Sequence, residues 1–257
     1  MAGHSHFANI MRTKARVDAR RGKAFSKISR LIQAAVRVGG PHARDNLRLQ
    51  YAIEKAKAAN MPKDTIQRIV DKASGAAGGA DFVEVTYEAY GPGGVAILIE
   101  ALTDNRNRTA PEVRVILDRN GGNIGNAGSV AWMFERKGVV EIPTERVSEE
   151  VLFDVALEAG ADDIVREGGG DGGGAERFVV TSTVTSFEPL RRALVDAGIE
   201  PLRAELEMVP SSTVQADEDT ARKVLKFQAL LEDTDDVQSV TTNLDVTEDV
   251  AARHAED

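Results

Sequence analysis

Residues 138–167, GVVEIPTERVSEEVLFDVALEAGADDIVRE, decide the fold of this chain. The apolar run that opens the stretch and the β-branched residues that close it are typical of strands, whereas the middle carries apolar residues at helical spacing. The acidic pair Glu149–Glu150 fits the start of that helix. The stretch therefore predicts a strand at 138–142, a helix at 148–159 and a strand at 163–167.

The residues that follow complete a supersecondary unit. GGGDGGG at 168–174 is typical of a flexible turn. After it the pattern predicts a strand at 176–181, a helix at 186–197 and a strand at 200–206. The order β-α-β-β-α-β is that of the ferredoxin-like unit, so we expect residues 136–206 to form a ferredoxin-like domain.

A second α+β region lies on the N-terminal side of this unit. Residues 83–89 alternate apolar and polar side chains, which predicts a half-buried strand. GPGG at 91–94 turns the chain into a buried strand at 95–102, and this pair predicts a hairpin. A helix is expected near 108–119.

A helix at 212–232 and a strand near 237–244 have no partners close to them in the sequence. We expect them to return to the hairpin and helix of 81–119, which makes the ferredoxin-like unit an insertion. The expected division of the chain is a helical domain at 1–75, a discontinuous α+β domain at 80–135 with 207–245, an inserted domain at 136–206 and an acidic tail at 246–257.

Residues 1–75 show only helical periodicity. Apolar residues recur at three- and four-residue intervals in three segments, separated by GGP at 39–41 and by Asn60 with Pro62. Asp45 is the expected N-cap of the second helix. Three short amphipathic helices can bury their apolar stripes only against one another. We therefore expect a three-helix bundle, and the fold class predicted for the chain is α+β.

Charge is divided unevenly along the chain. Residues 1–75 contain 16 Lys/Arg and 5 Asp/Glu, a balance of +11, although the formal net charge of the whole protein is −9. The remaining residues therefore carry 16 bases and 36 acids, a balance of −20. A basic segment on an acidic protein attracts polyanions to one region, so nucleic acid is the expected partner.

The basic residues gather on one side if 11–36 is one continuous helix. At about 100° per residue six of them share an arc of roughly 80° without an acid, and the apolar residues lie opposite. A merely solvated face would mix acids with bases, so we expect this cationic arc to contact nucleic acid. The arc comprises Arg12, Arg16, Arg20, Lys23, Lys27 and Arg30, with Lys14 and Arg21 at its flanks.

A second candidate contact lies in TDNRNRTAPEVR, residues 103–114. Asn105, Arg106 and Arg108 crowd the junction between a strand and a helix N-terminus, where backbone N–H groups favour anions. With Thr109 as the expected N-cap, the same residues also fit a hydrogen-bonded corner without a ligand. Both interpretations stay open at this point.

Other kinds of site find no support in the sequence. The absence of cysteine excludes disulfides and thiolate zinc sites, and His4 and His6 have no third ligand at metal spacing. No catalytic or dinucleotide-binding motif occurs. The longest apolar run, 95–102, is shorter than the roughly 20 residues that a membrane helix needs. We therefore expect a cytoplasmic protein that is not an enzyme and has no catalytic residue, metal, cofactor, small-molecule substrate or membrane partner.

Several long motifs resemble those of the YebC family: MAGHSHFANI, KAANMPKDTIQR, YEAYGPGGVAILIE, LTDNRNRT, NGGNIG and GSVAWMFERKG. The resemblance implies an N-terminal helical bundle and two ferredoxin-like domains, one inserted in the other. It implies a DNA-binding transcriptional regulator, although other family members resemble translation factors, including the mitochondrial translational activator of cytochrome oxidase. It also points to KARVDARRGK (14–23) and DNRNR (104–108) as contact sites.

Residues and resemblance together predict a DNA-binding transcriptional regulatory protein that holds the phosphate backbone through its basic N-terminal helices. The alternative is a ribosome-associated translation factor that uses the same surface on ribosomal or transfer RNA. Charge alone does not separate a DNA duplex from an RNA fold. The basic region holds few aromatic residues for stacking on RNA bases, which favours binding to a backbone.

Overall fold

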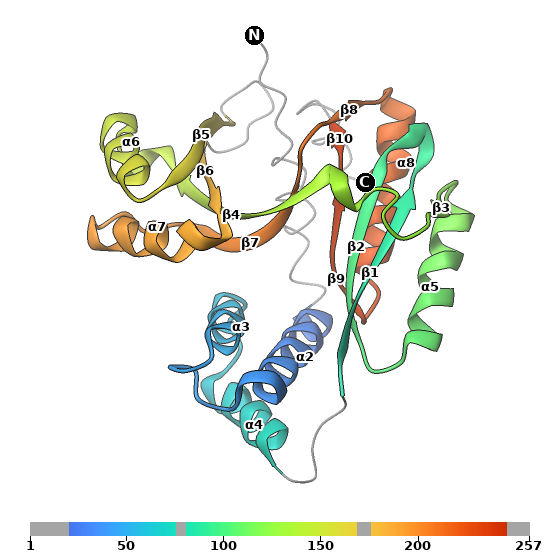
Figure 1. The fold of residues 1–257 in the computed structure, drawn as a ribbon, viewed down its shortest axis with the longest axis horizontal. Coiled ribbons are helices and arrows are strands. Elements are labelled where there is room, and N and C mark those ends of the chain that lie inside the picture. The colour runs from blue at the N-terminus through green and yellow to red at the C-terminus, as the bar shows by residue number, and fades with distance from the viewer. Residues whose placement is uncertain (1–20, 76–80, 169–175, 246–257) are drawn as a thin grey trace. The chain divides into compact units, whose positions relative to one another are not determined.

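The computed structural model describes residues 21–75, 81–168 and 176–245 (Figure 1). Two compact units are present. One contains the described residues of 21–130 together with 222–242, and the other contains those of 131–221 with 243–245. Each unit is described by itself below. The three-domain division expected from the sequence stays a prediction, and the acidic tail at 246–257 lies outside the described residues.

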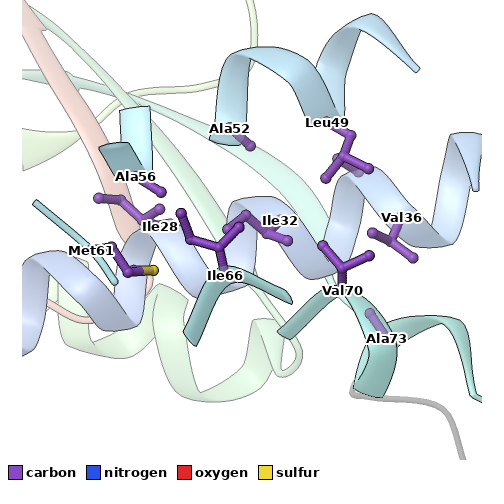
Figure 2. Close-up of a cluster of buried hydrophobic side chains, with 11 residues drawn as sticks. Ile28, Ile32, Val36, Leu49, Ala52, Ala56, Met61, Ile66, Val70 and Ala73 are labelled. Atoms are coloured by element: carbon purple, nitrogen blue, oxygen red, sulfur yellow. The ribbon is translucent and has the colours of Figure 1, made fainter. Parts of the chain in front are cut away.

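The basic region forms the predicted three-helix bundle (Figure 2). Its apolar stripes meet in one core, to which every helix contributes. Ile32, Leu49 and Val70 are among the side chains buried there. Contact with the other two helices therefore fixes the apolar side of the first. The bundle comprises α2 (Arg21–Gly39), α3 (Leu47–Ala58) and α4 (Lys63–Ser74).

Asn46, not Asp45, caps the second helix of the bundle, so that detail of the prediction was wrong. Its side-chain oxygen accepts a hydrogen bond from the backbone N–H of Leu49 at 3.0 Å. Its amide nitrogen donates to the carbonyls of Ala35 at 2.8 Å and Gly40 at 2.9 Å. A carboxylate cannot donate these two bonds, and therefore an asparagine suits this buried corner.

The sheet of the first unit is antiparallel, with the strand order β3-β1-β2-β9. The predicted hairpin is confirmed, because β1 pairs with β2, Val83 opposite Thr103 and Tyr90 opposite Ala96. The expected return of the C-terminal segment is confirmed, because β9 pairs with β2. The elements are β1 (Val83–Tyr90), β2 (Ala96–Thr103), α5 (Arg106–Arg119), β3 (Asn123–Ile124), α8 (Glu218–Glu232) and β9 (Val237–Thr242).

The helix expected over 212–232 begins only at Glu218. The residues before it include β8 (Val214–Gln215), which pairs in parallel with β10 (Leu244–Asp245). One-turn 3-10 helices lie at Pro92–Gly94, Ala131–Met133 and Thr144–Arg146. In the hairpin turn Gly93 and Gly94 adopt φ values of 72° and 75°, a region that favours glycine.

The second unit contains the predicted β-α-β-β-α-β order. Its antiparallel sheet has the order β5-β6-β4-β7. The last strand starts at Arg203 instead of the expected residue 200 and runs to Pro210, pairing with residues 134–141 of β4. The elements are β4 (Phe134–Pro143), α6 (Glu149–Glu158), β5 (Ala161–Glu167), β6 (Arg177–Thr183), α7 (Val184–Asp196) and β7 (Arg203–Pro210).

The two sheets share one spatial order of strands, although β1 precedes β2 in the chain. If β2, β3, β1 and β9 are counted as strands one to four of a ferredoxin-like sheet, the spatial order is 2-3-1-4, as it is in the second unit. The elements of the second unit separate β3 from α8 in the chain. The fold is therefore α+β, a three-helix bundle followed by two ferredoxin-like domains, one of which is inserted in the other.

Candidate nucleic-acid interface

Half of the predicted cationic arc lies within the described residues. Lys23, Lys27 and Arg30 occur at positions i, i+4 and i+7 of α2, a spacing that places them on one side of the helix. We call these three residues the cation row. Arg21 is the first residue of α2, and Arg12, Lys14, Arg16 and Arg20 lie outside the described residues.

The cation row faces the acidic turn, defined as residues 232–236, which joins α8 to β9 within the same unit. Lys23 Nζ lies 2.6 Å from Asp233 Oδ2. Lys27 Nζ donates a hydrogen bond to the carbonyl of Glu232. Lys23, Lys27 and, as described next, Arg30 therefore each have an acceptor on this turn.

Arg30 reaches the deepest acceptor of the turn. Its Nη1 lies 2.6 Å from Asp236 Oδ1 and also donates to the carbonyl of Asp235. Its guanidinium carbon lies 6.0 Å from the ring centroid of Phe82, within the range of a cation–π contact. Arg30 is thereby oriented by a carboxylate and an aromatic ring.

Asp236 joins the two predicted contact groups. Its side chain is 2% exposed, and its Oδ2 accepts hydrogen bonds from Thr109 Oγ1 at 2.6 Å and Thr103 Oγ1 at 3.1 Å. Arg108 binds both carboxylate oxygens through Nη2, at 2.9 Å and 2.7 Å. Burial alone would raise the pKa of Asp236, but these hydrogen bonds and the charge of Arg30 outweigh it and lower the pKa below its usual value.

The corner at 103–114 is capped differently from the prediction. Asn105 is the N-cap of α5 and accepts hydrogen bonds from the N–H groups of Asn107 and Arg108. Thr109, expected in that role, is buried inside the helix and donates to Asp236 instead. Arg106 is exposed, whereas Arg108 also pairs with Asp104 at 2.8 Å.

The residues that make these contacts border an open pocket of about 460 Å³. Lys23, Arg30 and Arg108 line it together with Glu112 and residues 233–236. The structure therefore brings members of both predicted groups to one place. Sequence reasoning missed Asp236, the residue that links them. The available signal was the run EDTDD at 232–236, although nothing local relates it to Arg30, about 200 residues earlier.

The surroundings of Lys27 in the cation row shift its pKa. Burial is the main cause that lowers its pKa from 10.5 to about 8, and the carboxylates of Glu232, Asp233 and Asp235 oppose that shift. A lysine whose pKa is lower in the folded than in the unfolded state costs stability while it is protonated in both states. That cost is complete below pH 8 and disappears as the pH rises toward 10.5.

The substitution Lys27→Met should accordingly stabilise the protein at pH 7. The drop from 10.5 to about 8 corresponds to about 3 kcal/mol, and the lost hydrogen bond to Glu232 offsets about 1 kcal/mol of it. We expect a gain of about 2 kcal/mol at pH 7 and none at pH 10.5, measured by chemical denaturation. A gain of equal size at both pH values would contradict the assignment of this pKa.

Within residues 21–75, 81–168 and 176–245, no group of three or more His, Cys, Asp or Glu side chains is arranged to hold a metal ion. No helix among these residues has the length and apolar character to cross a membrane.

The fold and the site define a class of protein, in which a basic three-helix module precedes two ferredoxin-like domains that carry acidic surface segments. The chain belongs to the TACO1/YebC family, which confirms the resemblance seen in its motifs. Residues 5–76 match the model of the TACO1/YebC protein N-terminal domain, and residues 82–244 match that of the TACO1/YebC second and third domain.

Relatives are similar over their full length. A probable transcriptional regulatory protein of Rubrobacter xylanophilus is 46% identical over 99% of this chain and 100% of its own. The transcriptional regulatory protein PmpR of Pseudomonas aeruginosa is 48% identical over 98% and 99%. The crystal structure of a conserved hypothetical protein from Aquifex aeolicus matches with a TM-score of 0.80 and 44% identity, covering 91% of this chain and 93% of that one.

Proposed function

We propose that this protein is a transcriptional regulator that holds DNA through phosphate contacts made by its basic helical module. The observation that carries the proposal is the separation of charge. Residues 21–75 alone contain 12 Lys/Arg against 4 Asp/Glu on a chain with a net charge of −9. The names of the relatives, which are called transcriptional regulatory proteins, support the regulatory role.

The geometry of the module favours contacts to phosphates over contacts to bases. The cation row consists of long flexible side chains one helical turn apart on α2. Such side chains fix a protein on nucleic acid without reading its sequence. We therefore propose the cation row, with Arg12, Lys14, Arg16, Arg20 and Arg21 before it, as the main contact, and Asn105, Arg106 and Arg108 as a second one.

The inserted domain lacks one familiar surface for RNA. Ferredoxin-like RNA-binding domains stack bases on aromatic residues of the open sheet face. Here Gly138 faces α7, because a Cβ on it would lie 2.4 Å from Phe187 Cδ2. Alternation along the strand places Glu141 on the opposite face, where it pairs with Arg203 at 3.0 Å. No aromatic residue shares that face in the described strands of this sheet, which favours DNA over base-stacked RNA.

Salt dependence tests the proposal. If the module neutralises several phosphates, the logarithm of the binding constant should fall with the logarithm of salt concentration by about 0.9 per contact on duplex DNA. Replacing Arg16, Arg20 and Lys23 by alanine should flatten this slope by about 2 to 3, as measured by fluorescence anisotropy. Alanine at Arg119, Lys223 and Lys226 removes the same charge from exposed positions elsewhere and should change the slope little.

An unaltered slope in the first variant would place the contact elsewhere, and the corner around Arg106 and Arg108 would be tested next. Crosslinking in cells, followed by sequencing of both nucleic acids, decides between the two partner classes. Promoter DNA is the expected result. Reads dominated by ribosomal RNA would overturn the transcriptional role in favour of a translation factor.

A further inference from the structure

The acidic turn resembles a short polyanion. Residues 232–236, EDTDD, carry four carboxylates in five positions. The turn is anchored to its own sheet, because the Asp236 carbonyl accepts a hydrogen bond from the N–H of Leu102 at 2.8 Å and the Thr234 N–H donates to Leu231 at 3.0 Å. Its position therefore does not depend on the contacts that it makes with α2.

The acidic turn accepts hydrogen bonds from the same side chains of the cation row that would otherwise bind phosphate groups. Asp233 meets Lys23, the Glu232 carbonyl meets Lys27, and the Asp235 carbonyl with Asp236 meets Arg30. Each of the three cations therefore meets a different part of the turn. A nucleic-acid backbone that binds the row must compete with at least the outer part of this turn.

The contacts of Asp233 and Asp235 on the turn are easier for a ligand to replace than those of Asp236. The pair Lys23–Asp233 is 49% and 34% exposed, so that solvent and salt screen it. Asp235 is exposed as well. Asp236, in contrast, is buried and shared with Thr103, Thr109 and Arg108. Phosphate can replace Asp233 and Asp235 while Asp236 continues to orient Arg30.

We propose that the acidic turn is an intramolecular competitor, which occupies the cation row and is displaced when nucleic acid binds. The proposal rests on the nucleic-acid-binding function proposed above. The apparent affinity of a ligand is lower when its site is already occupied in a fraction of the molecules. The turn therefore weakens loose, non-specific association, and only a backbone that engages several cations at once displaces it.

The experiment neutralises the half-buried Asp233 and the exposed Asp235 and leaves Asp236 in place. A labelled 25-base-pair duplex and a single-stranded RNA of equal length are titrated with the wild type and with Asp233→Asn/Asp235→Asn at low salt. We expect the variant to bind the duplex about fivefold more tightly, equivalent to about 1 kcal/mol at 1.4 kcal/mol per tenfold change. The control Glu149→Gln/Glu150→Gln removes two exposed negative charges from α6 and should change affinity less than twofold.

The outcomes separate the two proposals. If the wild type binds but the Asp233/Asp235 variant gains no more affinity than the control, the competitor proposal is overturned and the nucleic-acid-binding proposal is not. Weaker binding by that variant would also overturn it, because the turn would then position the cations for the ligand. If neither protein bound duplex or RNA, both proposals would be wrong. The urea midpoint of each variant shows that the fold is retained, and duplex added to the wild type should shift the NMR amide signals of residues 233–236.

Discussion

Replacing Asp236 by asparagine should lower the free energy of unfolding by about 3 kcal/mol. Removing one member of a buried ion pair typically costs 3–5 kcal/mol, because the partner charge is left uncompensated. We expect the lower end of that range, since the Arg108 side chain is 48% exposed and water can solvate it. The asparagine also brings an amide N–H group toward the donors of Thr103 and Thr109.

The effect should depend on pH in a defined direction. The hydrogen bonds to Asp236 lower its pKa in the folded protein below the ordinary value of 3.8. A group with a depressed folded pKa contributes stability above its unfolded pKa and loses it as the pH falls through the folded pKa. The advantage of the wild type over Asp236→Asn should therefore be complete at neutral pH and shrink below about pH 4.

Chemical denaturation at pH 7 and at pH 3 measures both effects, with Asp233→Asn as the matched control. Asp233 lies on the same turn but forms a partly exposed pair with Lys23, so its neutralisation should cost less than about 1 kcal/mol. Equal losses in the two variants would show that Asp236 does not anchor the turn.

The fold was predictable because its signals are local. Helical spacing in residues 21–75 and the β-α-β-β-α-β order after residue 134 both follow from burying one face of each element. The insertion was predictable for a related reason: a helix and a strand near the C-terminus had no neighbours to pack against. Errors occurred where side-chain hydrogen bonds decide the outcome, as at Asn46 and Thr109.

The site was predictable only in part, because its second half is distant in the sequence. The row of Lys23, Lys27 and Arg30 follows from helical spacing alone. That Asp236 would bind both Arg30 and Arg108 depends on the pairing of β9 with β2, which places the turn beside Thr103. Charge counting identifies where cations lie but does not identify which carboxylates they meet.

Replacing Ile32 by alanine should destabilise the helical bundle by about 3 kcal/mol. The Ile32 side chain is 0% exposed and lies in the core of the bundle together with Leu49 and Ile66 (Figure 2). Truncating a buried isoleucine costs 2–5 kcal/mol, because apolar contacts are lost and a cavity remains. Native-state hydrogen exchange of the α2 amides reports on the bundle by itself.

The control Val38→Ala lies on the same helix at a position that is 79% exposed, and it should change protection by less than about 0.5 kcal/mol. Similar effects of the two substitutions would contradict the packing of α2.

Ile32 and the cation row serve separate purposes on one helix, so their variants should affect different measurements. Ile32→Ala should lower protection and leave the salt slope of DNA binding unchanged while the bundle stays folded. Alanine at Lys23 should leave protection unchanged and lower the salt slope, because the half-exposed pair of Lys23 with Asp233 adds little to the fold.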